Sequence, residues 1–492
     1  MHGFLFFPAC CLILNLPIFM SVRMKWTITQ RAVTPCLVLL ACAALVAPPV
    51  YAESAKSKAR QIKAQAQAQA KTSTKASASA SAKASLKVSA KVPGKAARTK
   101  TPDKRRAVPL IASAALATPA RESSGGNAEA RLIDIYKLIG QANSREALIQ
   151  AENLVREYPN FQLAQLVYGD LLAAQVRPIR TLGDVPDTTA LSGAQKLAEL
   201  RQESQQRLRA LRERPEAGMM PSQFLTLSSR IKHAIAVDAS RSRLYLFENT
   251  ASGLKLLADY YISVGKSGIE KSLEGDLRTP LGVYFVTGSL DPKKLRDFYG
   301  SGALPINYPN QLDVKRGKTG SGIWLHGTPP QQFSRAPLAT DGCVVLANPD
   351  LERIIKTVEI RSTPVVIAQS LKWVAPQTAR ADSKLFEDAL SSWHAAKSSG
   401  DIPRLMSWYT ADFTSYGKTL TEWKPAMTTE VKQLAGREVQ LKDVSYMRWT
   451  DSADTMVVTF GELIQGAKSG QTKRQYWTRQ GGQWKIFFEG VI

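Results

Sequence analysis

The sequence has few cysteines and few histidines, which excludes several kinds of site. Its 492 residues include five cysteines and four histidines. Four of the cysteines lie in an apolar N-terminal region, and Cys343 is the one that lies beyond it. A mature chain without that region cannot form an internal disulfide, and a single thiolate cannot build a zinc cage. We therefore expect no metal site and no cofactor, since close ligand spacing is also missing among His233, His326 and His394.

Residues 53–126 have almost no aromatic or branched apolar side chains, and few acids. Residues 53–106 hold 15 Lys or Arg against Glu53 and Asp103, which supplies about half of the chain's net charge of +24. A segment of this composition cannot bury enough apolar surface to fold. The stretch therefore predicts a disordered basic linker, which acts as a spacer or contacts an anionic membrane surface or wall carboxylates.

Two apolar segments, residues 4–22 and 32–50, open the chain. A start at Met24 would give a short basic region, an apolar core and a small-residue cleavage site ending at Ala52. We predict that residues 1–52 contain a secretory signal, with an uncleaved inner-membrane anchor as the alternative. The chain is then exported to the periplasm or cell envelope. Export excludes nucleic acid as the partner of the basic linker.

Residues 127–220 have helical periodicity. Within them, residues 147–174 look like one tetratricopeptide-type helix pair with Pro159 at its turn, and a charged helix follows at 190–214. One copy is too few for a solenoid. We expect a small helical unit that packs on its neighbour, with binding of another protein as the alternative.

Residues 221–371 change to a period of two. Strands are expected at 234–238 and 243–247 as a pair, at 254–264, and after the stretch 278–284. A long aromatic loop at 299–313 is typical of a binding wall or lid. Many short strands with Gly and Pro turns predict a mixed β-sandwich.

The stretch 324–348 carries the strongest chemical signal. His326-Gly327 and Gly342-Cys343 are flanked by apolar runs, which indicates two buried strands with chemistry at their ends. A thiol needs a nearby base to act as a nucleophile at neutral pH. A histidine and a cysteine brought together by the fold would therefore suit acyl transfer.

This stretch resembles the L,D-transpeptidases of bacterial cell walls, the YkuD family. Their signature is a His-Gly followed by Ser/Thr-x-Gly-Cys, an apolar tail and often an Asn, and a Thr-Pro-x-Gly before a strand is a second match. The resemblance covers roughly residues 230–370. Asp341 departs from it where the family usually has His, and Val345 departs where it often has Arg.

The resemblance implies a peptidoglycan tetrapeptide stem as the substrate. Cys343 would be the nucleophile and His326 the base that forms a thiolate–imidazolium pair with it. The resemblance assigns the carbonyl of Gly327 to orient His326, and we expect the amides of Gly342 and Cys343 to hold the oxyanion. Further substrate-binding candidates are Arg335, Lys266, Thr340, Asn348 and Tyr299, of which Arg335 and Lys266 could bind a carboxylate.

Three functions stay open at this point. The first is a transpeptidase that passes the acyl group to an amine of a second stem. The second is an L,D-carboxypeptidase of the same fold, since carboxypeptidases that set cell shape also join a YkuD domain to an NTF2-like one. The third is a wall-binding scaffold with a degenerate site.

Residues 383–492 are expected to form a separate unit after a linker at 372–382. An amphipathic helix at 384–396 precedes strands at 439–449, 455–465, 473–479 and 484–490, an order that looks like the NTF2-like α+β cone. Packing or binding, for instance of other wall-synthesis proteins, is expected here rather than catalysis. The whole chain is thus predicted to be a multidomain α+β protein.

Overall fold

The computed structural model describes residues 127–184, 187–434 and 437–492. The predicted signal at 1–52 and the predicted linker at 53–126 lie outside these ranges. Across the described ranges, no helix has both the length and the apolar character needed to cross a membrane.

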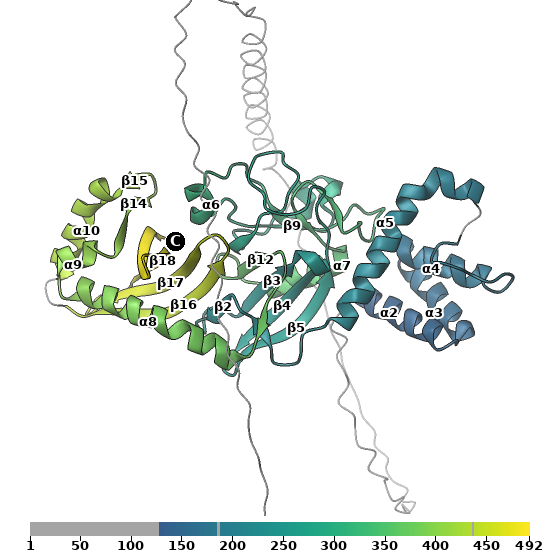
Figure 1. Cartoon of the computed structure of the whole chain (residues 1–492), viewed down its shortest axis with the longest axis horizontal. Helices are drawn as coiled ribbons and strands as arrows, with labels where there is room; N and C mark the ends of the chain where they lie inside the picture. The colour runs from purple at the N-terminus through teal and green to yellow at the C-terminus, as the bar shows by residue number, and fades with distance from the viewer. Residues whose placement is uncertain (1–126, 185–186, 435–436) are drawn as a thin grey trace, which may run out of the picture. The chain divides into compact units, whose positions relative to one another are not determined.

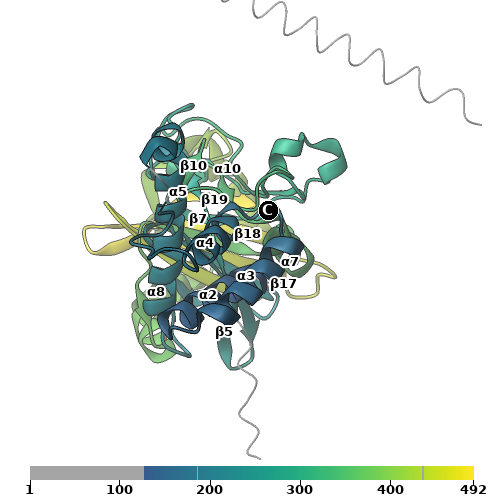
Figure 2. The ribbon, with the colours of Figure 1, turned by 90° about the vertical axis from the view of Figure 1, so that its right-hand side faces the viewer.

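Four helices form the first part of the described chain, and Figure 2 shows α2, α3 and α4 side by side. Their apolar faces share one core that includes Leu132, Leu154 and Phe161. The helix pair predicted at 147–174 is confirmed, with Pro159 between its two members. The bounds are α2 Asn127–Gly140, α3 Ser144–Glu157, α4 Gln162–Ala173 and α5 Asp187–Arg212.

A five-stranded mixed sheet of order β5-β4-β3-β12-β7 follows. The predicted strand pair is confirmed, with Ala234 opposite Phe247 and Asp238 opposite Arg243. β12 lies parallel to β3 and antiparallel to β7. The bounds are β3 His233–Asp238, β4 Arg243–Thr250, β5 Gly253–Tyr261, β7 Gly282–Phe285 and β12 Pro364–Ala368.

A second layer packs on this sheet and carries the candidate site. It consists of a three-stranded sheet of order β11-β9-β8, a two-stranded sheet of β10 and β6, and helix α7. Ile235 of the first layer shares a core with Leu325 and Leu351 of the second. The bounds are β6 Val264–Gly265, β8 Ala303–Pro305, α6 Gln311–Lys315, β9 Trp324–His326, β10 Leu338–Thr340, β11 Val344–Val345 and α7 Asn348–Thr357. The predicted mixed sandwich is confirmed.

The last part of the chain is a curved, mostly antiparallel sheet with helix α8 along one side (Figure 1), in which β14 pairs with β19 in parallel. Phe386 and Trp393 of α8 are buried in the same core as Trp477 and Ile486 of the sheet. All four predicted strands are present, while β14 was not predicted. The bounds are α8 Pro376–Ser398, α9 Ile402–Met406, β14 Tyr409–Ser415, β15 Lys418–Thr419, α10 Leu420–Leu434, β16 Val439–Thr450, β17 Asp454–Ile464, β18 Gln471–Gln480 and β19 Gln483–Val491.

The linker predicted at 372–382 is wrong. Strand β13, Trp373–Val374, pairs with β1, Met220–Pro221, and α8 already begins at Pro376. Strand β2, Phe224–Thr226, lies in the range predicted for the sandwich but pairs with β16 in the C-terminal sheet. Phe224 is fully buried there, so burial of apolar side chains joins two parts that were expected to be separated by a linker.

Candidate active site

Parallel pairing of β9 with β11 brings the two catalytic candidates together. Val344 lies opposite Leu325 and Val345 opposite His326. Cys343 immediately precedes β11, so the same register places it beside Trp324. Because side chains alternate along a strand, Cys343 and His326 lie on one face of this sheet.

His326 is held still and kept neutral. Its Nδ1 lies 2.7 Å from the Gly327 carbonyl oxygen, which can only accept, so Nδ1 carries the proton and Nε2 is the free base. The rings of Tyr299 and Phe298 lie 5.0 and 5.8 Å from the imidazole. Burial lowers the pKa of His326 to about 4, although the hydrogen bond to Gly327 acts in the opposite direction.

Cys343 is half-buried, and its Sγ lies 3.6 Å from the Gly322 carbonyl oxygen. Burial raises the pKa of the thiol, against the effect of the Trp324 amide. A raised thiol pKa beside a lowered imidazole pKa opposes the predicted thiolate–imidazolium pair. Among the described residues no hydrogen bond joins Sγ to His326 either. Both shifts favour a neutral thiol beside a neutral imidazole, and desolvation is the main physical cause of each.

The turn before Cys343 is fixed by two threonines. The Gly342 N–H donates to Thr340 Oγ1 at 3.1 Å, and that hydroxyl donates to the Cys343 carbonyl at 2.7 Å. Thr279 Oγ1 donates to the Gly342 carbonyl at 2.9 Å. Gly342 has φ +124, and a Cβ there would lie 2.7 Å from the Arg278 carbonyl oxygen, so this turn needs glycine.

Two of the sequence assignments are corrected by this turn. The Gly342 N–H already has the Thr340 hydroxyl as its acceptor, so the structure does not present it as a free oxyanion donor. Thr340 is buried and engaged on both sides, so it holds the turn and does not face a substrate. In the sequence, Thr279 was only the first residue of the Thr-Pro-x-Gly match. Its hydrogen bond to Gly342 could not be predicted, because it depends on the fold that brings the two residues together.

Asn348 was expected to contact the substrate, but its side chain forms hydrogen bonds with backbone groups. Its Oδ1 accepts from the N–H groups of Ser301 and Thr328 at 3.0 and 3.1 Å. Its Nδ2 donates to the Thr328 carbonyl at 2.9 Å. A Cβ on Gly327 would lie 2.0 Å from Oδ1, so the close approach of this amide requires the glycine after His326. Asn348 thereby fixes the carbonyl that orients the base.

Lys266 and Arg335, the two candidate carboxylate ligands, differ in their partners. Lys266 Nζ pairs with Asp341 Oδ1 at 2.9 Å, and both side chains are more than half exposed. Arg335 lies over the Phe298 ring with its guanidinium carbon 4.4 Å from the centroid. Its Nε is buried and has no hydrogen-bond partner in the part of the chain that the structure describes. Arg335 is therefore the cation better placed to receive an anion.

Tyr299 forms a wall of the site, as the aromatic loop indicated. Its ring meets His326 edge to face and lies 4.9 Å from the Trp324 ring. Its carbonyl accepts from the Gly327 N–H at 3.1 Å. Phe298 was missed because an aromatic residue in a loop gives no sequence signal for contact with a distant histidine.

Comparisons with known proteins identify the two folded parts that follow the helices. Residues 232–367 match the model of the L,D-transpeptidase catalytic domain, YkuD. The chain contains an L,D-transpeptidase catalytic domain. This YkuD domain gives the chain a peptidoglycan-related role in the L,D-transpeptidase family. Residues 385–490 match the Cds6 C-terminal NTF2-like domain. Among the described residues, no group of three or more His, Cys, Asp or Glu could hold a metal ion.

Solved structures resemble the chain over about half of its length. Bd1075 from Bdellovibrio bacteriovorus is 23% identical, covering 56% of this chain and 98% of that one, with a TM-score of 0.48. The helical cell shape determining protein Pgp2 from Campylobacter jejuni is 22% identical, covering 55% of this chain and 95% of that one, with a TM-score of 0.45. The comparison with curated proteins gave no match.

Proposed function

We propose that this chain is a cysteine-dependent acyltransferase that acts on peptidoglycan tetrapeptide stems. The observation that carries the proposal is a neutral His326, oriented by the Gly327 carbonyl, on the same sheet face as Cys343. A base whose lone pair is free at neutral pH can take the thiol proton during attack. The matched YkuD domain supplies the reaction class.

The reaction takes two steps on these residues. In the first, His326 Nε2 takes the thiol proton while Sγ attacks the carbonyl of the third stem residue. The same imidazolium then protonates the departing amine, the C–N bond breaks, D-alanine leaves and a thioester remains. In the second, an amine of another stem attacks the thioester, giving a 3→3 cross-link, and Cys343 recovers its proton. The Cys343 N–H remains the proposed oxyanion donor, because that of Gly342 is engaged.

An L,D-carboxypeptidase is the second candidate, and the NTF2-like domain favours it. The sequence resemblance extends to carboxypeptidases that set cell shape and join a YkuD domain to an NTF2-like one, and residues 385–490 match an NTF2-like domain. In that reaction water attacks the thioester and the product is a tripeptide. Both candidates place the chain in the cell envelope, with wall peptides as partners. The helical and NTF2-like units would bind other wall-synthesis proteins, and the basic linker would contact the membrane surface.

The products formed from a disaccharide-tetrapeptide decide between the candidates. The full chain is incubated with this substrate and the products are identified by mass, with the Cys343→Ala variant beside it. Cross-linked dimers that require Cys343 are the expected result. Tripeptide and D-alanine without dimers would instead establish the carboxypeptidase. If neither product depends on Cys343, both proposals fail and a binding module remains.

The pH dependence of the reaction should show an unusually acidic lower limb. Because burial lowers the pKa of His326 to about 4, the base stays neutral as pH falls from 7 to about 5. We expect kcat/KM to hold its value over this range and to fall only near pH 4. The upper limb should lie above the usual thiol range, since burial raises the pKa of Cys343.

Fold stability must be measured across the same range. A histidine whose pKa is lower in the folded chain binds its proton better when unfolded, so stability declines as pH falls below 6.5 toward 4. Circular dichroism at each pH separates unfolding from protonation of the base. A lower limb near pH 6.5 with the fold intact would contradict the neutral-pair mechanism.

A further inference from the structure

The segment between the two catalytic residues, residues 327–342, lies against the helical unit; we call it the active-site loop. Phe333 is buried and stacks on Phe161, with ring centroids 4.2 Å apart. The Tyr158 ring meets it edge to face at 5.5 Å. Asn160 holds the backbone on both sides, since its carbonyl accepts from the Phe333 N–H at 3.1 Å and its Nδ2 donates to the Pro330 carbonyl at 2.9 Å. The turn between α3 and α4 thus forms a socket for Phe333.

Further contacts hold the loop on either side of Arg335. Ser334 Oγ donates to Glu203 Oε1 of α5 at 2.6 Å. On the other side, Tyr261 OH donates to the Arg335 carbonyl at 2.8 Å, and Ser263 Oγ donates to the Ala336 carbonyl at 2.6 Å. The backbone of Arg335 is therefore fixed between the helical unit and the YkuD sheet.

A cavity of about 420 Å³ opens where α5 faces this loop. Lys196 and Glu199 of α5 line it together with Pro329 and Arg335 of the loop and Phe298. Phe298 joins it to the catalytic pair, because its ring also meets His326 at 5.8 Å. The volume is within the range of small-ligand sites, roughly 300–1,000 Å³. Neither the YkuD domain nor the helical unit encloses this cavity alone.

The charges of the cavity favour an anion. Lys196 and Glu199 pair with each other at 3.6 Å, and the ion pairs of the described residues include none with Arg335. Burial lowers the pKa of Arg335, although the charge of Asp341 acts to raise it, so the guanidinium is partly desolvated. A desolvated cation is costly until an anion binds it, and a planar guanidinium matches a carboxylate with two parallel hydrogen bonds.

We propose that this cavity is a composite subsite for the terminal carboxylate of a wall peptide. Arg335 binds the carboxylate, Lys196 adds positive charge from α5, and Phe333 is a positioning residue that seats the loop. The subsite rests on the proposed function for its substrate class. It adds that the helical unit is part of the peptide-binding site and not only a support.

Equilibrium binding tests the subsite without requiring turnover. The full chain carrying Cys343→Ala is titrated by calorimetry with a disaccharide-tetrapeptide and with its C-terminal amide. The acid should bind at least about tenfold more tightly than the amide, since the amide cannot accept a charge-assisted pair. Arg335→Gln should remove this preference, and Lys196→Gln should reduce it.

Phe333→Ala tests positioning, and Arg212→Gln is the matched control. Arg212 lies exposed on the same helix as Lys196 and outside the cavity lining, so the control should keep the full acid preference. Phe333→Ala should lose the preference while circular dichroism shows the same helix content, and Phe333→Tyr should restore it. A purely structural role would weaken acid and amide equally.

Two results would overturn the subsite. One is equal binding of acid and amide by the parent, and the other is an acid preference that survives in Arg335→Gln. Because these measurements need no chemistry at Cys343, the subsite can fail while product formation succeeds. The reverse outcome, acid preference in a chain without turnover, would keep the subsite and reject the acyltransferase.

Discussion

Replacing Cys343 with alanine is expected to lower product formation from tetrapeptide stems by at least ~10³-fold, because the variant has no nucleophile to form the thioester. The fold should be unchanged. Cys343 is half-buried just before β11, and its turn is held by hydrogen bonds from the hydroxyls of Thr340 and Thr279, which the substitution leaves in place. Steady-state rates by product mass, with unfolding curves for parent and variant, check both statements.

His326→Gln provides the matched comparison. Glutamine keeps a donor that can reach the Gly327 carbonyl but has no basic nitrogen, so the rate should fall by a similar factor. The double variant should be no slower than either single variant, because residues that act as one unit are not additive. Substantial activity in Cys343→Ala would show that another group is the nucleophile.

The sequence predicted the elements that positioned this pair. Alternating apolar residues gave the strands around Ala234 and Leu244, and the His-Gly and Gly-Cys pairs marked the ends of β9 and β11. Such patterns are local, because one buried face dictates the side-chain period along a single strand. The resemblance added the Gly327 carbonyl, and the structure places that carbonyl 2.7 Å from Nδ1.

What the sequence did not predict depends on contacts between distant residues. The Gly342 N–H was expected to donate to the oxyanion, but it donates to the hydroxyl of Thr340. Asp341 was only a departure from a motif, and the structure pairs it with Lys266. Strand β2 was not predicted because three residues are too few to show an alternating pattern. Its extended conformation depends on pairing with β16 and not on local propensity. The same holds for the pKa of His326, which burial sets.

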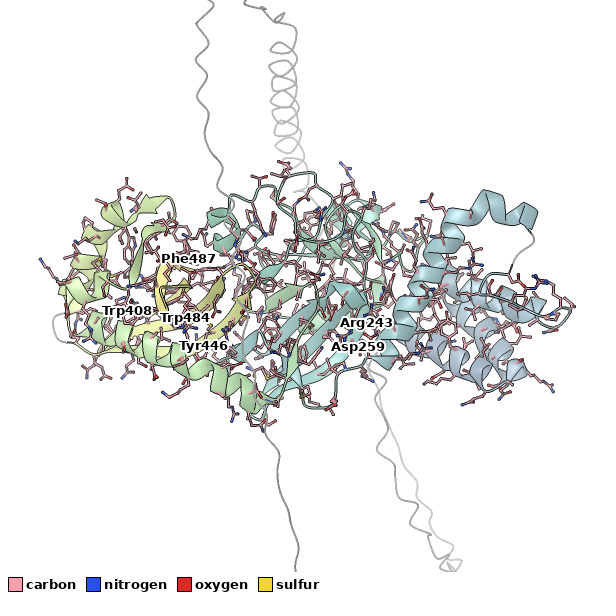
Figure 3. All side chains as sticks on the ribbon, viewed as in Figure 1. Arg243, Asp259, Trp408, Tyr446, Trp484 and Phe487 are labelled. Atoms are coloured by element: carbon pink, nitrogen blue, oxygen red, sulfur yellow. The ribbon has the colours of Figure 1, made fainter. Side chains whose placement is uncertain are left out.

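A buried charge network joins the helical unit to the YkuD domain, and Arg207 lies at its centre. Arg207 Nη1 donates to Glu129 Oε1 and Nη2 to Glu203 Oε1, each at 2.7 Å. Arg243 of β4 bonds Glu129 at 2.8 Å and also pairs with Asp259. Figure 3 labels Arg243 and Asp259, which lie close together. The side chains of Arg207, Glu129 and Glu203 are 2%, 4% and 3% exposed, so water cannot replace a lost partner in this network.

Arg207→Met should therefore lower the free energy of unfolding by roughly 3–5 kcal/mol, the usual cost of removing one partner from a buried ion pair. Methionine fills similar space but leaves Glu203 with only the hydroxyl of Ser334. Arg207→Lys should lose less, because its ammonium keeps a positive charge beside the two carboxylates. It should still be less stable than the parent, since a lysine cannot reproduce the paired hydrogen bonds of the guanidinium fork. Urea unfolding followed by circular dichroism measures the change, and Arg212→Met on the exposed side of the same helix is the control.

The same variant links stability to the active site. Burial acts to raise the pKa of Glu129, but the charges of Arg243 and Arg207 hold this pKa below its usual value. The stability that ionised Glu129 contributes is present above about pH 4.5 and is lost as pH falls through the lowered pKa. Arg207→Met should therefore shift acid unfolding to higher pH. Because Glu203 also bonds Ser334 of the active-site loop, the acid preference at Arg335 should weaken with it. A loss below ~1 kcal/mol would mean that the network is solvated and does not hold the helical unit in place.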